Sequence, residues 1–405
     1  MPKVELAPRS EHQTHLLTTV AATVAQEAKT VSAASVHLDA IRGIAALVVF
    51  FGHARQMFLM SPTQAILGVS DPRGASTTSW GHQAVIVFFV LSGYLVGGSI
   101  LRNVRLQRCS WSGYALNRMT RLWIVLIPAV FLGWALDTWG LAHFAGQQTI
   151  YQSPPEQNLF VGNLTSRLTP GVATGNILFL QTIRVDTLGT NDALWSLANE
   201  FWYYAAFPFL AIAVWGRRRA WIRVGCAFAS AAILLFVGSS IAFYFSIWLA
   251  GVGAAALPCR IPSRLQHISA TISTLVFVAL NVLLRKVNLP IKSSDSVLAV
   301  GFVALLYCLL HLRQPAHLGI YQRVAQFLSR MSYTLYLTHL PALALVCAIM
   351  VKPWHRWATT PWHLMQFSFV VACVFCYSVL VFYCFEAHTS KVRRCLAKLG
   401  TLRFC

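Results

Sequence analysis

Long apolar stretches with almost no charged residue recur along the chain between residues 43 and 385. They cannot all be buried in the core of one water-soluble domain, and most are long enough to cross a bilayer as a helix. Only 11% of the residues are Asp, Glu, Lys or Arg, whereas soluble proteins have about a quarter. The sequence therefore predicts an all-α, polytopic membrane protein and excludes a water-soluble fold.

We expect about ten transmembrane helices, bounded by the ends of the apolar runs. The apolar segment 175–184 is too short to cross and is interpreted as a re-entrant or interfacial piece. Residues 1–36 then form a mobile tail, residues 37–390 the membrane domain and residues 391–405 a basic tail. The candidate spans are residues 40–60, 83–101, 121–141, 194–215, 220–237, 239–257, 268–285, 296–312, 331–351 and 364–386.

Basic residues between the apolar runs set the expected orientation. A net charge of +20 would suggest nucleic acid as the partner of a soluble protein, but here the Lys and Arg residues form short clusters in the loops. Most of them lie on the side that carries both termini, and the positive-inside rule makes that side cytoplasmic. We therefore expect both termini in the cytoplasm, contact with anionic membrane lipid and no nucleic-acid partner.

Ten cysteines are scattered through the chain, several of them inside apolar runs. Cys373 and Cys376 have CxxC spacing, but they lie within a predicted span and have no other ligand residues beside them. Packing explains the pair better than metal or redox chemistry. We expect no disulfide framework and no metal site.

The first predicted span carries an arginine near one end and a histidine near the other. Arg42 and His53 are eleven residues apart, about 16.5 Å along a helix, and eleven steps of about 100° return to nearly the same face. Ionisable groups inside a span are costly, so both are candidate functional residues. The alternatives are that Arg42 snorkels or pairs with Asp39, and that His53 is a satisfied histidine at a helix end.

Two further arginines stand at the mouth of the third predicted span. Arg118 and Arg121 are three residues apart, so their planar, bidentate guanidinium groups can converge on one phosphate. Ordinary positive-inside charge is the competing explanation. With Arg42 on the same membrane face, the pair forms a candidate site for the phosphates of a coenzyme A donor. We expect these arginines and His53 to belong to a single passage through the helix bundle. Ser92, in the stretch FFVLSGYL, either lines this passage or lets helices pack closely.

Five more residues complete the candidate set. Glu200 is one of the few acids inside a predicted span, and it either hydrogen-bonds a catalytic group or neutralises a buried arginine. Trp195, Tyr94 and His339 are candidates for binding the acceptor. Glu386 ends the last span beside basic residues, which is as consistent with an ion pair as with catalysis.

Taken together, these segments resemble the acyltransferase-3 family of bacterial membrane acyltransferases, in the family's order and over most of residues 37–390. The ending at Tyr383–Glu386 matches loosely, because Ala387 and His388 follow where the family has a basic residue and a proline. The five matching motifs are LDxxRGxAAxxV…H (Leu38 to His53), FFxLSGYL (Phe88 to Leu95), RxxRL (Arg118 to Leu122), LWSLxxEFxxY (Leu194 to Tyr204) and SYxLYLxHxP (Ser332 to Pro341).

The resemblance implies a ten-helix domain that takes an acyl group from cytoplasmic acyl-CoA and transfers it to an acceptor across or within the membrane. It implies that Arg42 and His53 are essential and associates Arg118 and Arg121 with the donor. We expect an O-acyltransferase of a bacterial inner membrane. Its donor is expected to be acetyl-CoA, and its acceptor a carbohydrate or glycolipid hydroxyl, as in exopolysaccharide, O-antigen or lipo-oligosaccharide.

The chemistry expected of this site is attack of a sugar hydroxyl on a thioester. His53 serves as general base or as a transient acyl carrier, with Arg42 and Glu200 as further catalytic residues. The outer loop 142–193 is predicted to act as a lid over the acceptor. A transporter or flippase is the rival class, because intramembrane Arg, His and Glu also line ion pathways. A catalytically silent scaffold that binds acyl-CoA or glycan is a third hypothesis.

Overall fold

The computed structural model describes residues 33–60, 80–144, 146–152, 163–258, 261–287, 289–312 and 319–399. In these ranges the regular secondary structure is helical, apart from two isolated β-bridges. The prediction of an all-α protein is confirmed. The division into two tails and a membrane domain stays a prediction, and residues 1–32 lie outside the described ranges.

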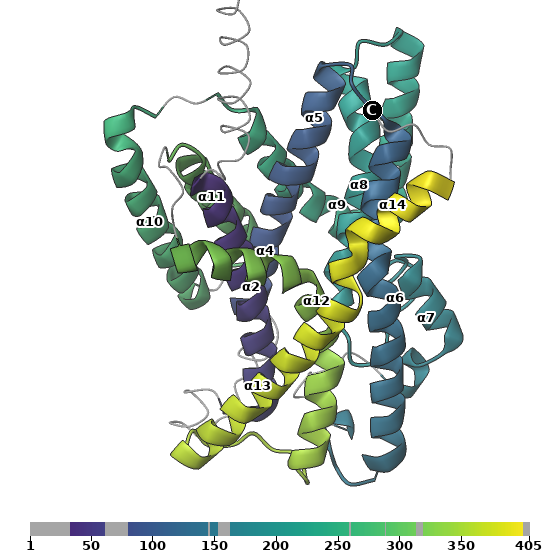
Figure 1. The fold of residues 1–405 in the computed structure, drawn as a ribbon, viewed down its shortest axis with the longest axis vertical. Coiled ribbons are helices and arrows are strands. Elements are labelled where there is room, and N and C mark those ends of the chain that lie inside the picture. Colours follow the sequence, from purple (N-terminus) through teal and green to yellow (C-terminus); the bar gives the residue numbers. More distant parts are fainter. Residues whose placement is uncertain are drawn as a thin grey trace, which may run out of the picture.

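The helices follow one another as an up-and-down bundle (Figure 1). One of them, α4, continues through a π-helical turn, η1 (Gly93–Gly97), into α5. The α-helices are α2 (Ala33–Phe58), α4 (Trp80–Ser92), α5 (Gly98–Arg105), α6 (Trp111–Phe144), α7 (Pro170–Ile177), α8 (Leu194–Trp215), α9 (Ala220–Ala256), α10 (Gln266–Lys286), α11 (Ile291–Leu310), α12 (Gly319–Met350), α13 (Pro361–Cys384) and α14 (Thr389–Leu399).

Nine helical stretches among the described residues are long and apolar enough to cross a membrane. One of them, α9, has 37 residues, about 55 Å if it were straight, whereas the hydrocarbon layer is about 30 Å thick. It is broken at Gly238, whose φ of 84° and ψ of 170° are not helical and suit a residue without Cβ. The break falls between the predicted spans 220–237 and 239–257, so the prediction of about ten transmembrane helices is confirmed. The side on which the termini lie stays a prediction.

The helix α12 forms the centre of the bundle. It packs against α2, α6 and α13, and most side chains of its apolar stretch are buried. The helices α10 and α11 pair on the flank opposite α6 and α7 (Figure 1). Phe228, Leu235 and Leu275 are largely exposed, as expected where helices face lipid. Cys373 and Cys376 are also exposed and not disulfide-bonded. The prediction that the pair serves packing inside the bundle is therefore wrong.

Two glycines bring α4 and η1 into backbone contact with α9. A Cβ on Gly93 would clash with the carbonyl oxygen of Trp248, and a Cβ on Gly251 would clash with the carbonyl oxygen of Val90. Only glycine allows helices to approach this closely. The contact holds the π-helical turn that follows Ser92 against α9.

The described part of the long segment 142–193 is packed against the helices. The helix α7 has eight residues, about 12 Å in length, which is too short to cross. The indole Nε1 of Trp123 donates to Ile177 O, and that of Trp202 donates to Phe179 O, each at 2.9 Å. This segment therefore folds back between α6 and α8. The lid role predicted for residues 142–193 stays a prediction.

A buried carboxylate ties the end of this loop to α6. The carboxylate of Asp137 accepts hydrogen bonds from the Thr190 amide at 2.8 Å and from the Thr190 hydroxyl at 2.9 Å. Asn191 donates to Leu337 O of α12 at 2.8 Å. Side chains of α6 and backbone of α12 thus fix the loop just before α8 begins.

Candidate active site

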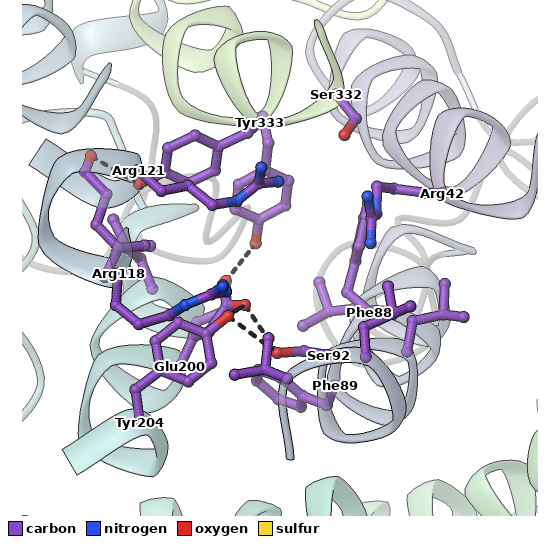
Figure 2. Close-up of a pocket in the computed structure, with 18 residues that line it drawn as sticks. Arg42, Phe88, Phe89, Ser92, Arg118, Arg121, Glu200, Tyr204, Ser332 and Tyr333 are labelled. Carbon is purple, nitrogen blue, oxygen red and sulfur yellow. Dashed lines mark hydrogen bonds between the residues drawn. The ribbon is translucent and has the colours of Figure 1, made fainter. Parts of the chain in front are cut away.

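A cavity of about 260 Å³ lies between α2, α4, α6, α8 and α12 (Figure 2). One side is apolar, and the other carries most of the charged groups. Five of the residues predicted from the sequence line it together, although they come from four helices that are far apart in the chain. These residues are Arg42, Ser92, Arg118, Arg121 and Glu200.

The cavity has more cationic than anionic groups. Among the described residues, no carboxylate lies within ion-pair distance of Arg42, Arg118 or Arg121. The Nη1 of Arg42 lies 3.5 Å from the hydroxyl of Ser329, which donates to Asp39 at 2.7 Å. Arg42 therefore meets Asp39 through a serine and does not pair with it directly.

The guanidinium group of Arg118 points into the cavity and not toward solvent. Its guanidinium carbon lies 5.7 Å from the centre of the Tyr204 ring, a distance at which a cation is attracted by the aromatic face. Its Nε is buried and has no hydrogen-bond partner among the described residues. Figure 2 shows Arg118 and Arg121 on one side of the cavity and Arg42 on the other. One orphaned donor and three guanidinium groups without a carboxylate partner among the described residues favour an anionic ligand.

The one carboxylate of the cavity is held by neutral donors. The Oε1 of Glu200 accepts a hydrogen bond from Ser92 at 2.9 Å and a second from the hydroxyl of Tyr204. The indole of Trp248 donates to Ser92 Oγ at 3.1 Å. Glu200 therefore anchors a network between α4, α8 and α9. Sequence analysis did not single out Tyr204 or Trp248; Tyr204 ends the LWSLxxEFxxY motif, but nothing local marks Trp248.

His53 is paired with the other intramembrane histidine of the motifs. The Nδ1 of His53 lies 2.8 Å from the Nε2 of His339, and the two rings are nearly parallel with centres 5.2 Å apart. His339 was predicted to bind the acceptor, but it is fully buried and contacts His53. The partners are 286 residues apart, so no local pattern could reveal the pair.

The backbone determines which nitrogen of His53 carries hydrogen. The Nδ1 of His339 lies 2.8 Å from Leu335 O, and only a protonated nitrogen can donate to a carbonyl. In neutral His339 the Nε2 is then an acceptor, so His53 donates to it from Nδ1. The Nε2 of His53 is left with its lone pair, the form that a base or nucleophile requires.

A tyrosine separates the cavity from the histidine pair. Tyr336 lines the cavity, and its ring centre lies 6.3 Å from that of His339. Its hydroxyl is 2.8 Å from Ser196 Oγ, across from Phe88. His53 and His339 are not among the lining residues. The cavity that holds the arginines therefore does not reach the histidine pair, and the Tyr336 side chain interrupts the single passage expected from the sequence.

Three other candidates lie outside the cavity. Trp195 packs edge-on against Phe89, with ring centres 5.9 Å apart, and Tyr94 lies in the π-helical turn; neither lines the cavity. The carboxylate of Glu386 accepts hydrogen bonds from the Thr334 hydroxyl at 2.5 Å and the Thr334 amide at 3.2 Å. Glu386 makes no ion pair among the described residues, so it joins the end of α13 to α12.

Comparison with known proteins agrees with this architecture. The profile of the acyltransferase-3 family, described as an acyltransferase domain, matches residues 36–381, from α2 almost to the end of α13. The chain belongs to this family, which confirms the resemblance found in its motifs and makes it a membrane protein of the acyltransferase class.

A curated relative adds a more specific similarity. The chain is 27% identical to the O-acetyl transferase of Shigella phage Sf6 over 198 residues, which are 48% of this chain and 55% of the relative. The chain thus spans about half the length of that relative. No solved structure matches the chain.

Proposed function

We propose that the protein is an O-acetyltransferase of the bacterial inner membrane. It transfers an acetyl group from cytoplasmic acetyl-CoA to a hydroxyl of a carbohydrate or glycolipid on the other side. The observation that carries the proposal is a cavity that gathers Arg42, Arg118 and Arg121 around a single lining carboxylate, with the histidine pair behind Tyr336. Membership of the family and the printed name of the phage relative support the acyl group and the type of bond.

In this proposal the arginine cavity binds the diphosphate of coenzyme A. Three guanidinium groups outnumber the one carboxylate, Glu200, and that carboxylate already accepts two hydrogen bonds. Bidentate contacts of arginine with phosphate oxygens would also satisfy the buried Nε of Arg118. Glu200 then keeps Ser92 and Tyr204 in place around the ligand and does not contact the reacting atoms.

The length of the donor fits the distance from the arginines to His53. Arg42 and His53 lie eleven residues apart on α2, about 16.5 Å along the helix axis. The pantetheine arm of coenzyme A contains two amide units and reaches about 15 Å when extended, by analogy with an extended peptide. With its phosphates at the arginines, the thioester can therefore reach His53 once the Tyr336 ring turns away from Ser196.

The reaction at His53 follows from its tautomer. Nε2 accepts the proton of the acceptor hydroxyl while the hydroxyl oxygen attacks the thioester carbonyl carbon. The new C–O bond forms, the C–S bond breaks, and the imidazolium returns the proton to the coenzyme A thiolate. The alternative is attack by Nε2 itself, which would place the acetyl group on His53 before transfer.

The test uses membrane vesicles that contain the full chain. Wild-type protein is expected to release free coenzyme A thiol from acetyl-CoA when alkali-treated surface polysaccharide is added, and to leave acetyl esters on the polysaccharide. His53→Ala at the same protein level should lose both signals. Retained transfer in that variant would remove His53 from the mechanism, and CoA-independent uptake or flipping of a glycan would favour a transporter.

A further inference from the structure

Four helices bring a second polar and aromatic group together at the end of the bundle away from the arginines. The Nε2 of His82 lies 3.0 and 2.9 Å from the two carboxylate oxygens of Asp295. The hydroxyl of Tyr244 donates to the same carboxylate at 3.0 Å. Trp195 stands beside them, with its ring parallel to that of His82 and 5.7 Å from that of Tyr244. We call these four residues the His82 cluster.

The His82 cluster lies at the depth of the histidine pair. His82 is ten residues before Ser92 on α4, about 15 Å along the axis, much as His53 is about 16.5 Å from Arg42. The helices α2 and α4 cross where a Cβ on Gly52 would lie 3.9 Å from Gly81 Cα. Since His53 and His82 follow these glycines, their Cα atoms are at most about 13 Å apart.

The aromatic side of the cluster borders the donor cavity. Trp195 contacts Phe89, and Phe89 also lines the cavity. The ring centres of Phe89 and Tyr244 lie 5.7 Å apart. The His82 cluster and the histidine pair thus flank the far end of the cavity, one behind Phe89 and the other behind Tyr336.

A purely structural role explains the cluster poorly. A carboxylate inside a membrane bundle is costly, and apolar side chains would join α4 to α11 at least as well as an ionisable pair. Asp295 is nearly as buried as Asp137, at 3% against 1% exposure, but it holds an imidazole and a phenol, whereas Asp137 accepts a backbone amide and a threonine hydroxyl. His82 is 17% exposed at its side chain, and Trp195 is also partly exposed.

We infer that His82, Asp295, Tyr244 and Trp195 form the recognition site for the acceptor carbohydrate. Asp295 is nearly fully buried and already accepts three contacts, so it holds His82 and Tyr244 in place, and the partly exposed ring of His82 forms the polar edge of the site. The partly exposed ring of Trp195, which packs against Tyr244, offers an apolar face for the C–H face of a sugar. The inference rests on the proposed function and adds the residues that select the acceptor.

The test separates the acceptor from the donor. Tyr244→Phe and His82→Gln are assayed in vesicles with acetyl-CoA and alkali-treated surface polysaccharide as the probe. Each weakens a hydrogen bond to Asp295 that positions the cluster and should raise the KM for polysaccharide about ten-fold, the effect of about one hydrogen bond. The KM for acetyl-CoA and the slow hydrolysis of acetyl-CoA without polysaccharide should not change.

Tyr203→Phe is the matched control, because Tyr203 OH donates to Ile241 O at 2.9 Å and also joins α8 to α9. This variant should keep the wild-type KM for polysaccharide. An unchanged KM in the two cluster variants, or an equal rise in Tyr203→Phe, would overturn the inference and leave the proposed function standing. No transfer to polysaccharide by the wild type would instead overturn the proposed function itself.

Discussion

Removal of the His339 acceptor should slow the chemical step while His53 remains in place. In His339→Leu the Nδ1–H of His53 loses the acceptor that lies 2.8 Å away, and both rings sit inside the bundle. A buried donor left without a partner costs about 1–3 kcal/mol, and the orientation of Nε2 is lost with it. If that whole cost appears in the barrier, kcat falls about 5- to 150-fold. Loss of His53 itself should cost more, about 10²- to 10⁴-fold.

The companion variant is His339→Gln, whose amide oxygen can still accept from His53. It should recover part of the lost rate, whereas a simple packing role would make Leu the better replacement. His311→Leu is the matched control, because His311 is also buried and its Nδ1 lies 2.5 Å from the carbonyl four residues earlier. It should keep the wild-type rate.

The assay follows thiol release from acetyl-CoA in vesicles, normalised to protein in the membrane. The KM for acetyl-CoA should be unchanged in both His339 variants, because the arginine cavity is intact. Wild-type kcat in His339→Leu, or equal rates in His339→Leu and His339→Gln, would refute the positioning role of His339.

Three further changes probe the rest of the site. Arg118→Ala should raise the KM for acetyl-CoA at least ten-fold with little change in kcat; competition by free coenzyme A measures this, and an unchanged KM would place the phosphates elsewhere. Ser196→Ala removes the hydrogen bond that holds Tyr336 and should increase acetyl-CoA hydrolysis without acceptor; hydrolysis at the wild-type rate would contradict the separating role of Tyr336. Gly251→Val places a side chain against Val90 O and should destabilise the protein by at least about 1–3 kcal/mol, seen as less protein in the membrane and a lower Tm in detergent; a normal Tm would mean that α9 can move aside.

The spans could be predicted because hydropathy is a property of each segment alone. An apolar run of sufficient length must form a helix in the bilayer wherever it packs, and even the break in α9 was visible as two adjoining runs. The arginine cavity was predicted in part, because Arg42, Arg118 and Arg121 stand in motifs on one membrane face.

The contacts that could not be predicted from the sequence are those between side chains on different helices, because they depend on how the helices cross. The pairing of His53 with His339, the indole of Trp248 on Ser92 and the contact of His82 with Asp295 each join helices far apart in the chain. Their formation depends on which faces meet, and glycine contacts such as Gly93 against Trp248 decide this. Hydropathy carries no information about which helix faces meet. In the sequence, His82 and Asp295 are therefore only two polar residues near span ends, and nothing indicates that they are in contact.

The concentration of positive charge around Arg42, Arg118 and Arg121 has a consequence for turnover. Under the proposed function these groups bind the phosphates of acetyl-CoA, which do not react. Free coenzyme A, the product, keeps all of these phosphates. The cavity would then retain free coenzyme A about as firmly as the loaded form. The rate of glycan modification would in that case follow the ratio of acetyl-CoA to free coenzyme A in the cytoplasm. Modification of the cell surface would then depend on central metabolism without a separate regulatory site.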